Sequence, residues 1–308
     1  MDRVGFLGLG IMGTPMAMRL AEAGVPLMVW NRDPSRCEPL LRAGAQHGAT
    51  QDDVLRACRV NLFMLADEHA IDEVLGRGTP DFSRRVAGRV LVFMGTTAPE
   101  YATALAADIA AAAGTHVEAP VSGSKVPAEQ GRLVAMLAGR ADVVDEVEGI
   151  IKPMCRSIHR CGSEAGSALK MKLAVNLYLV TTVAALAESV HFAQRQKLDL
   201  DTFVSIINAG QMASPVAEIK GAKLRERDFS AQAAIHDVRK NSGFVVSAAR
   251  SAGIATPMAD TADRLYDETV RLGFGDEDMA AVVRAIEHRT ESSSDAPDGG
   301  RRPAALEE

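Results

Sequence analysis

The sequence predicts an α/β domain with a doubly wound parallel sheet, followed by an all-α helical domain, on three observations. Short apolar runs alternate with segments of helical period through the first half of the chain, which is typical of βαβ units around a parallel sheet. A glycine-rich turn closes the first of these runs. From about Ala165 onward the sequence shows helical periodicity and no strand pattern, so the second half is expected to be helical.

The predicted strands of the first domain are five short runs rich in apolar and β-branched residues, over 3–7, 27–30, 60–65, 90–93 and 116–118. Helices are expected between them, among others over 12–23 and 100–113. Each predicted strand is thus separated from the next by a segment that includes helix, as a parallel sheet requires.

The predicted helices of the second half cover 167–194, 200–209, 231–252, 258–272 and 277–288. The first spans about 28 residues, roughly 42 Å at about 1.5 Å per residue, so it is expected to join the two domains. The domains are therefore placed at 1–163 and 164–290. Residues 291–308 contain almost no large apolar side chains, so this tail is expected to be disordered.

The composition favours a soluble protein that binds small ligands. The 308 residues are 47% hydrophobic and 24% charged, with a formal net charge of −6, which argues against nucleic acid or an anionic membrane as partner. The apolar stretch 173–187 is interrupted by Asn176 and closed by Glu188, so a buried helix is favoured over a membrane span. No CxxC spacing or signal peptide is evident, which predicts a cytoplasmic setting and free thiols at Cys37, Cys58, Cys155 and Cys161.

A glycine-rich turn follows the first predicted strand and opens a helix, the context that a Rossmann-type dinucleotide site needs. Gly8 allows the tight turn, Gly10 lets the backbone approach a pyrophosphate, and Gly13 lets helix and strand pack closely. The positive end of the helix then faces the phosphates. The predicted cofactor contacts of the turn are Gly8, Leu9, Gly10, Ile11, Met12 and Gly13.

The residues after the second predicted strand indicate which dinucleotide is bound. A site for NAD usually places an acid there, on the ribose 2′-hydroxyl, whereas this sequence has Asn31 and Arg32. A guanidinium suits a 2′-phosphate, so NADP(H) is predicted over NAD(H). The alternative is that Arg32 is merely solvated and Asp33 is the ribose acid. Asp33 followed by Pro34 is also typical of a helix cap.

Three motifs, the glycine-rich turn and two further ones, make the sequence resemble the β-hydroxyacid dehydrogenase family of 3-hydroxyisobutyrate dehydrogenase-like enzymes. They are Gly-Phe-Leu-Gly-Leu-Gly-Ile-Met-Gly at 5–13, Glu-Ala-Pro-Val-Ser-Gly-Ser-Lys at 118–125 with Pro-Ala-Glu-Gln-Gly at 127–131, and Lys-Leu-Ala-Val-Asn at 172–176. The second motif is most similar to the glyoxylate and succinic semialdehyde reductase branch. The resemblance covers residues 1 to about 289.

The resemblance implies that Lys172 is the catalytic acid and Asn176 its companion. Hydride delivery to an aldehyde builds negative charge on oxygen, which an ammonium can stabilise and protonate. An unperturbed lysine pKa of about 10.4 would keep Lys172 charged, and positions four apart share a helix face. The alternative is a surface lysine, as expected for Lys170.

The resemblance also assigns Ser122 and Gly123, with the adjacent Ser124, to the substrate carboxylate. Backbone N–H groups and a hydroxyl in such a turn suit an anion. A plain turn after the preceding strand is the alternative, and Lys125 is most simply a solvated loop residue. The sequence shows neither histidine spacing typical of metal sites nor a Gly-x-Ser-x-Gly elbow, so no metal and no serine hydrolase chemistry are expected.

On the cofactor side, the resemblance points to the loop Leu65, Ala66 and Asp67, to Thr96 and to Lys240. Asp67 equally suits a helix cap, and Lys240 a solvated helix position.

The sequence departs from the family pattern at three positions. Gly95 replaces the family's serine, Ala233 an aromatic of the reductase branch, and Asn241 an aspartate. Ala233 and Asn241 are expected to line a substrate wall, so the loss of a phenyl group and a carboxylate predicts a substrate bulkier than glyoxylate.

Together these features predict NADPH-dependent reduction of a small carboxylate-bearing aldehyde, or the reverse oxidation of the alcohol, in a cleft between the domains. An imine reductase-like enzyme and a non-catalytic NADP-binding scaffold are the alternatives, both disfavoured by Lys172. The apolar character of 177–187 on most helix faces predicts a homodimer or a dimer of dimers.

Overall fold

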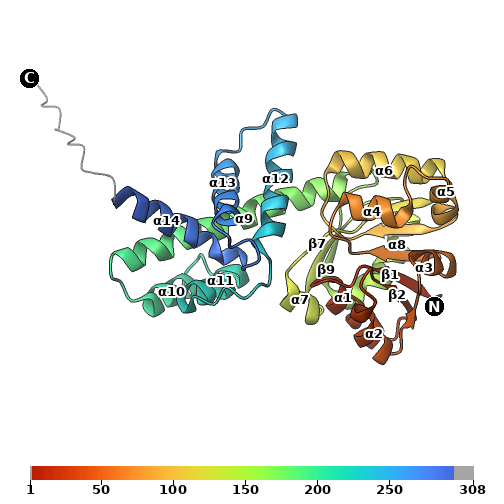
Figure 1. The fold of residues 1–308 in the computed structure, drawn as a ribbon, viewed down its shortest axis with the longest axis horizontal. Coiled ribbons are helices and arrows are strands. Elements are labelled where there is room, and N and C mark those ends of the chain that lie inside the picture. The colour runs from red at the N-terminus through yellow and green to blue at the C-terminus, as the bar shows by residue number, and fades with distance from the viewer. Residues whose placement is uncertain (1, 295–308) are drawn as a thin grey trace, which may run out of the picture. The chain divides into compact units, whose positions relative to one another are not determined.

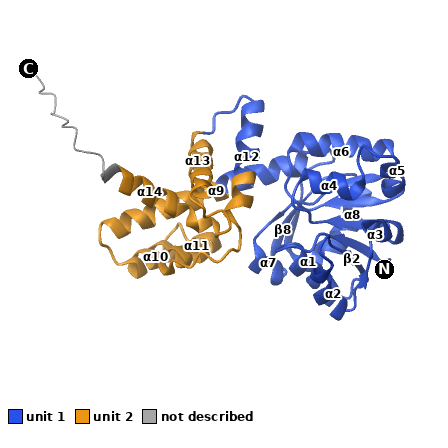
Figure 2. Ribbon diagram, in the orientation of Figure 1, with its two compact units in different colours: residues 1–178, 241–256 blue, residues 179–240, 257–308 orange. Residues whose placement is uncertain are grey.

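The computed structural model describes residues 2–294 and divides into two compact units. Within the described residues, unit 1 comprises 2–178 and Asn241–Thr256, and unit 2 comprises Leu179–Lys240 and 257–294 (Figure 2). The boundary thus differs from the one predicted at residue 163, because the first turns of the long helix pack into unit 1. Of the tail expected to be disordered, residues 291–294 instead complete a helix, and 295–308 lie outside the described residues.

The main sheet of unit 1 is parallel and six-stranded, in the order β3-β2-β1-β4-β5-β6. Its strands are β1 (Val4–Leu7), β2 (Leu27–Trp30), β3 (Gln46–His47), β4 (Val60–Phe63), β5 (Val90–Phe93) and β6 (Thr115–Glu118). The five predicted strands end within two residues of their predicted bounds, and only the two-residue β3 was not anticipated. The strand order reverses between β1 and β4, as in doubly wound dinucleotide-binding folds.

Both faces of this sheet are buried, since alternate strand residues join different apolar cores. Phe6 and Leu62 pack on one side with Met16 of α1 (Gly13–Glu22), while Leu7 and Phe63 pack on the other. Figure 1 shows the helices of this unit around the sheet. The helices of unit 1 that precede the long helix are α1 (Gly13–Glu22), η1 (Pro34–Cys37), α2 (Glu38–Arg42), α3 (Gln51–Ala57), α4 (Glu68–Leu75), α5 (Asp81–Val86), α6 (Pro99–Ala111), α7 (Lys125–Glu129), α8 (Ala141–Ile151) and η2 (Lys152–Met154).

A second, three-stranded sheet in unit 1 was not predicted. It pairs β7 (Val121–Ser122) antiparallel with β8 (Leu133–Leu137), and β8 parallel with β9 (Cys155–Arg160). The β8 segment reads Leu-Val-Ala-Met-Leu, which lacks the alternation of a half-buried strand and contains strong helix formers. Tertiary pairing rather than local pattern therefore determines this sheet.

The second half of the chain is helical, as predicted. Its elements are α9 (Ser167–Arg195), α10 (Leu200–Ala209), α11 (Pro215–Glu226), α12 (Ile235–Ser251), α13 (Pro257–Arg271), η3 (Met279–Val282) and α14 (Val283–Ser294). Helix α11 was missed, although Ser214 caps it and Pro215 occupies its first turn, both typical start signals.

Helix α12 begins at Ile235 rather than at the predicted residue 231, and the buried Asp278 explains the difference. Its carboxylate accepts the N–H groups of Gln232 at 3.0 Å and Ala233 at 3.2 Å, and it forms an ion pair with buried Lys220 at 2.8 Å. These bonds hold the preceding segment outside the helix.

Helix α9 meets the length and composition criteria of a membrane span, with 39% of its most apolar window buried. The core helix of a soluble protein passes the same test.

Candidate active site

Four neighbouring strands of the main sheet end side by side. Leu7, Phe63, Phe93 and Glu118 are successive register partners across β1, β4, β5 and β6. The segments singled out by sequence, residues 8–13, 64–67, 94–96 and 119–124, therefore start at one edge of the sheet. Ligands of open parallel sheets bind at this edge.

The glycine-rich turn at this edge has the shape of a phosphate cradle. Gly8 has a φ of +100°, and a Cβ there would lie 2.2 Å from the Met64 carbonyl oxygen. A Cβ on Gly13 would lie 1.9 Å from the Gly8 carbonyl oxygen, whereas around Gly10 the space within 4 Å is open. Gly8 and Gly13 thus close the turn, and the exposed Gly10 leaves room for a ligand against the backbone.

The start of helix α1 is free to receive an anion. Its N-cap residue, Met12, makes no side-chain cap bond, and its first turn contains no acidic residue. The Thr14 N–H already donates to the Gly10 carbonyl oxygen at 3.1 Å, so it is the positive end of the helix that favours phosphate binding. A dinucleotide pyrophosphate therefore fits the residues that are present.

Asn31 supports the turn from within the protein. Its Oδ1 accepts the N–H of Leu9 at 2.8 Å, and its Nδ2 donates to the carbonyl oxygen of Asp33 at 3.0 Å. Asn31 therefore fixes the turn whether or not it also contacts the cofactor.

The neighbouring Asp33 is a helix cap, as its sequence context suggested. Its carboxylate accepts the N–H of Ser35 at 3.0 Å and the Ser35 hydroxyl at 2.7 Å. The hydroxyl and N–H of Ser35 hold the pKa of Asp33 below its usual value. Arg32 is exposed and forms no hydrogen bond or ion pair with the described residues, so its guanidinium is available to a 2′-phosphate.

The loops after β4 and β5 adjoin the glycine turn. A Cβ on Gly8 would lie 2.9 Å from Leu65, and one on Gly95 would lie 3.1 Å from the carbonyl oxygen of Leu65. Asp67 caps α4 by accepting the N–H of Ala70 at 2.8 Å, which confirms its capping role. Thr96, beside Gly95, is half-buried, and its contact with the cofactor stays a prediction.

The predicted carboxylate-binding loop is shaped around Gly123. Ser122 ends β7, and Gly123 has a φ of +125° with Leu133 and Pro127 closely packed against it. Lys125 forms an exposed ion pair with Glu129 at 3.7 Å, in agreement with a solvated loop residue.

Lys172 and Asn176 are both buried in helix α9. Their exposed fractions are 7% and 3%, whereas Lys170 is exposed. The Nδ2 atom of Asn176 has no hydrogen-bond partner, and Lys172 forms no hydrogen bond or ion pair, among the residues that the structure describes. Two partnerless polar groups one helical turn apart are typical of a ligand site rather than of a core.

Burial changes the expected charge state of Lys172. Desolvation lowers its pKa from 10.5 to about 8, so the assumption of an unperturbed pKa near 10.4 was wrong. Sequence alone could not reveal this shift, because it depends on which side chains surround the ammonium. A pKa near 8 leaves the group mostly protonated at pH 7 and easily deprotonated above it.

The small sheet connects helix α9 to the predicted carboxylate-binding loop. Met136 and Ala138, at the end of β8, pack with Ala168 and Val175 of α9. The neighbouring strand β7 pairs with β8 through Ser122 and Val134. The segment that carries Lys172 and the strand that carries Ser122 therefore rest on the same structural support.

Three other predicted site residues divide between the two units. Asn241 belongs to unit 1, and its Oδ1 atom lacks a hydrogen-bond partner among the described residues. Ala233 and Lys240 belong to unit 2, where Lys240 lies 4.0 Å from Asp237. Their contacts with cofactor and substrate stay predictions.

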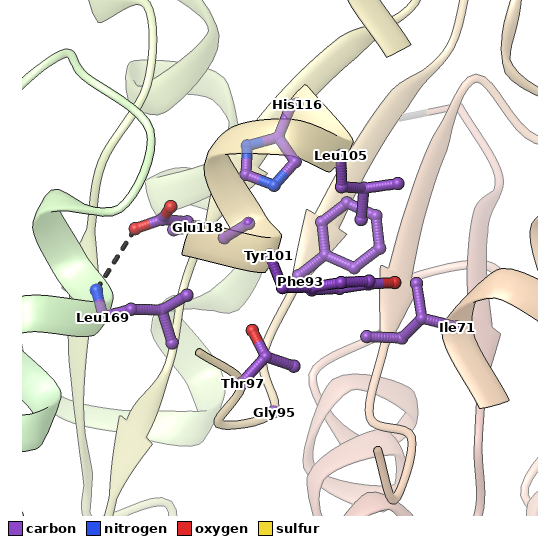
Figure 3. A pocket seen from close by; sticks show the side chains of 10 residues that line it. Ile71, Phe93, Gly95, Thr97, Tyr101, Leu105, His116, Glu118 and Leu169 are labelled. Atoms are coloured by element: carbon purple, nitrogen blue, oxygen red, sulfur yellow. Dashed lines mark hydrogen bonds between the residues drawn. The ribbon is translucent and has the colours of Figure 1, made fainter. Parts of the chain in front are cut away.

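A small cavity of about 10 Å³ is lined in part by Gly95. Its volume is enough for about one water molecule. Its lining includes Gly95, Thr97, His116 and Glu118 (Figure 3). Burial lowers the pKa of His116 to about 4, so this side chain is neutral at pH 7. Neither His116 nor the Glu118 side chain was predicted to have a role, because a strand pattern does not show what its terminal residues contact.

Comparisons with known proteins agree with this geometry. Residues 3–162 match the family model described as the NAD binding domain of 6-phosphogluconate dehydrogenase. Residues 166–286 match the model described as NAD-binding of NADP-dependent 3-hydroxyisobutyrate dehydrogenase.

Similar sequences and structures cover nearly the whole chain. Glyoxylate/succinic semialdehyde reductase 2, chloroplastic, of Arabidopsis thaliana is 32% identical, over 92% of this chain and 79% of the relative. Glyoxylate/succinic semialdehyde reductase 1 of the same plant is 30% identical, over 94% of this chain and 99% of the relative. The crystal structure of 3-hydroxyisobutyrate dehydrogenase from Salmonella typhimurium has a TM-score of 0.84 at 23% identity, covering 92% of this chain and 99% of that one.

Proposed function

This chain is an NAD(P)-dependent dehydrogenase or reductase of the β-hydroxyacid dehydrogenase family, and we propose that it uses NADPH to reduce a small aldehyde acid to the corresponding hydroxy acid, or catalyses the reverse oxidation. The observation that carries the proposal is that the buried residues Lys172 and Asn176 lie one helical turn apart, with no hydrogen-bond partner for the Asn176 Nδ2 and no ion pair for Lys172 among the described residues.

The chemistry of Lys172 fits either direction. When bound, the nicotinamide supplies a hydride to the carbonyl carbon or accepts one from the alcohol carbon. In reduction the Lys172 ammonium donates its proton to the carbonyl oxygen, and the resulting neutral amine takes a proton from solvent. In oxidation the neutral amine removes the hydroxyl proton. A pKa of about 8 populates both forms near neutral pH, which suits a general acid or base.

Asn176 and the loop at Ser122 orient the substrate. The free Nδ2 of Asn176 suits the same carbonyl oxygen as Lys172, because residues four apart project from one helix face. The hydroxyl of Ser122 and the backbone of Gly123 would bind the substrate carboxylate. With one pair of residues on the carbonyl oxygen and the other on the carboxylate, this arrangement suits a substrate acid whose carbonyl group is close to its carboxylate.

Two observations support NADP(H) over NAD(H). Asp33 is engaged as a helix cap, which makes it a poor ribose ligand, and Arg32 is exposed without a partner in the described chain. The description of the model matched by residues 166–286 also names an NADP-dependent enzyme.

Two departures from the resembled pattern support a substrate bulkier than glyoxylate. Ala233 stands in place of an aromatic residue and Asn241 in place of an aspartate. Steady-state turnover of glyoxylate, succinic semialdehyde, methylmalonate semialdehyde and bulkier aldehyde acids, each with NADPH and with NADH, tests function and substrate size together.

The outcomes of this screen separate the alternatives. NADPH oxidation with at least one semialdehyde, lost in Lys172→Ala and kept in Lys170→Ala, supports the proposal. Turnover of cyclic imines alone would favour an imine reductase, and NADPH binding without any turnover a scaffold. Turnover confined to glyoxylate would refute the larger pocket.

An exposed apolar stripe on α9 supports a homodimer or a dimer of dimers. Met171, Tyr178 and Phe192 are 49%, 75% and 63% exposed, and they lie at multiples of seven residues along one helix. Such spacing suits helix packing against another helix. Light scattering on the double variant Tyr178→Asp/Phe192→Asp should show monomers, whereas Met258→Asp, also on an exposed apolar residue, should not change the assembly.

We propose a cytoplasmic location. All four cysteines are free thiols, the state that a reducing compartment maintains.

A further inference from the structure

Glu118 forms a buried cap on the helix that carries Lys172 and Asn176. Its exposed fraction is 1%. Its carboxylate accepts the N–H groups of Gly166, of Ala168 at 3.0 Å and of Leu169 at 3.2 Å, the last drawn in Figure 3. The first N–H groups of a helix have no partner within the helix, so one distant side chain satisfies three donors at the start of α9.

The backbone of Glu118 is fixed on both sides. It pairs with Phe93 in the main sheet. On its other side the N–H donates to the Ala138 carbonyl oxygen at 2.9 Å, and its own carbonyl oxygen accepts the Ala138 N–H at 3.0 Å. The carboxylate therefore projects from a point where the two sheets of unit 1 meet. A group held this rigidly sets the position of whatever it binds.

The chain that enters α9 is also constrained. Gly166 has a φ of +91°, and a Cβ there would lie 3.1 Å from the Thr103 hydroxyl oxygen. The single proton of that hydroxyl is shared between the Pro99 carbonyl oxygen at 2.9 Å and the Ala165 carbonyl oxygen at 3.3 Å. These contacts limit the directions in which helix α9 can leave Gly166. The hydrogen bonds to Glu118 then select one direction.

A continuous helix transmits this position to the proposed active site. Lys172 lies four residues after Ala168 and three after Leu169, which is one helical turn. Among the described residues, neither Lys172 nor Asn176 has a partner that would hold its head group in place, so the placement of the helix sets the points from which both side chains project. We propose that Glu118 is a positioning residue, which holds the start of α9 so that Lys172 and Asn176 meet the substrate oxygen. The inference rests on the proposed function of Lys172.

The cap needs an ionised carboxylate. Burial raises the pKa of the Glu118 carboxyl, while the N–H groups of Gly166, Leu169 and Ala168 favour the charged form. Both oxygens act as acceptors in the three bonds. Glutamine keeps the size of the side chain but turns one acceptor into a donor, and aspartate keeps the charge on a side chain one methylene shorter.

Glu118→Gln tests the proposal, with Glu164→Gln as the matched control, because Glu164 is exposed and close to the same helix start. NADPH titration first counts the binding sites, so that kcat refers to folded enzyme. We expect Glu118→Gln to lower kcat on the order of 10- to 100-fold, as small misplacements of catalytic groups do. The KM for NADPH should stay unchanged, since the glycine turn binds the cofactor. The pH midpoint of kcat should move away from the wild-type value, and the control should match wild type.

A purely structural cap gives a different result. If Glu118→Gln lowers Tm but keeps kcat per binding site and its pH midpoint, the proposal is overturned. If that variant does not fold, Glu118→Asp decides by the same measurements, since its shorter side chain must release or displace the helix start. Full turnover by Lys172→Ala would instead remove the proposed function itself, whatever the Glu118 variants do.

Discussion

Replacing Lys172 by methionine should abolish catalysis and at the same time stabilise the protein. Lys172 is 7% exposed, and desolvation lowers its pKa from 10.5 to about 8. At about 1.36 kcal/mol per pKa unit, this shift means that the charged lysine costs the folded state about 3 kcal/mol. Methionine has a similar length and no charge, so we expect Lys172→Met to raise the free energy of unfolding at pH 7 by about 2–3 kcal/mol.

The pH dependence of this gain follows from proton binding. Between about pH 8 and the unfolded pKa of about 10.4, the unfolded chain holds a proton at Lys172 that the folded protein has released. Wild-type stability therefore rises with pH in this window. The stability of Lys172→Met lacks this pH-dependent rise. The difference in free energy of unfolding between variant and wild type should therefore be full below about pH 8 and shrink towards about pH 10.4.

Urea unfolding of wild type and Lys172→Met at pH 7 and pH 10 measures both effects. The control is Lys170→Met, an exposed position where the change should stay within about 0.5 kcal/mol. Equal or lower stability of Lys172→Met at pH 7 would refute the reasoning, because it would mean that the ammonium has a partner or remains hydrated in the folded protein.

Three other predictions concern the site. The kcat of reduction should fall as pH rises through about 8, because deprotonated Lys172 cannot donate; a profile flat to pH 10 would exclude it as the acid. Arg32→Glu should raise the KM for NADPH at least 10-fold, about 1.4 kcal/mol, and barely change that for NADH, with Arg42→Glu as control; equal losses for both cofactors would contradict a 2′-phosphate contact. Gly10→Ala should keep wild-type stability yet weaken NADPH binding, because the space at Gly10 is open in the protein and is where the cofactor would lie. Gly13→Ala should destabilise the apoprotein, since its Cβ would lie 1.9 Å from a carbonyl oxygen. Similar melting temperatures for the two variants would contradict this prediction.

The elements with strong local signals were predictable. Five strands of the main sheet and the helices α9 and α10 follow from hydrophobic period and from turn residues, which act within a few positions along the chain. The capping roles of Asp33 and Asp67 were recognised in the same way, because a cap and its helix are adjacent in sequence. Strand β8 was not, since its run from Leu133 to Leu137 has no period of its own.

The sequence by itself determined the doubly wound sheet, the glycine turn and the residues proposed to perform the chemistry. The glycines at 8 and 13 are required by backbone contacts within the turn, so their meaning is local. The tertiary structure decided the environment of the proposed catalytic lysine. The pKa of Lys172 depends on the removal of water by surrounding side chains. The bonds from Glu118 to α9 join residues about 50 positions apart. Desolvation and long-range hydrogen bonds exist only once the chain is folded, which is why no pattern in the sequence shows them.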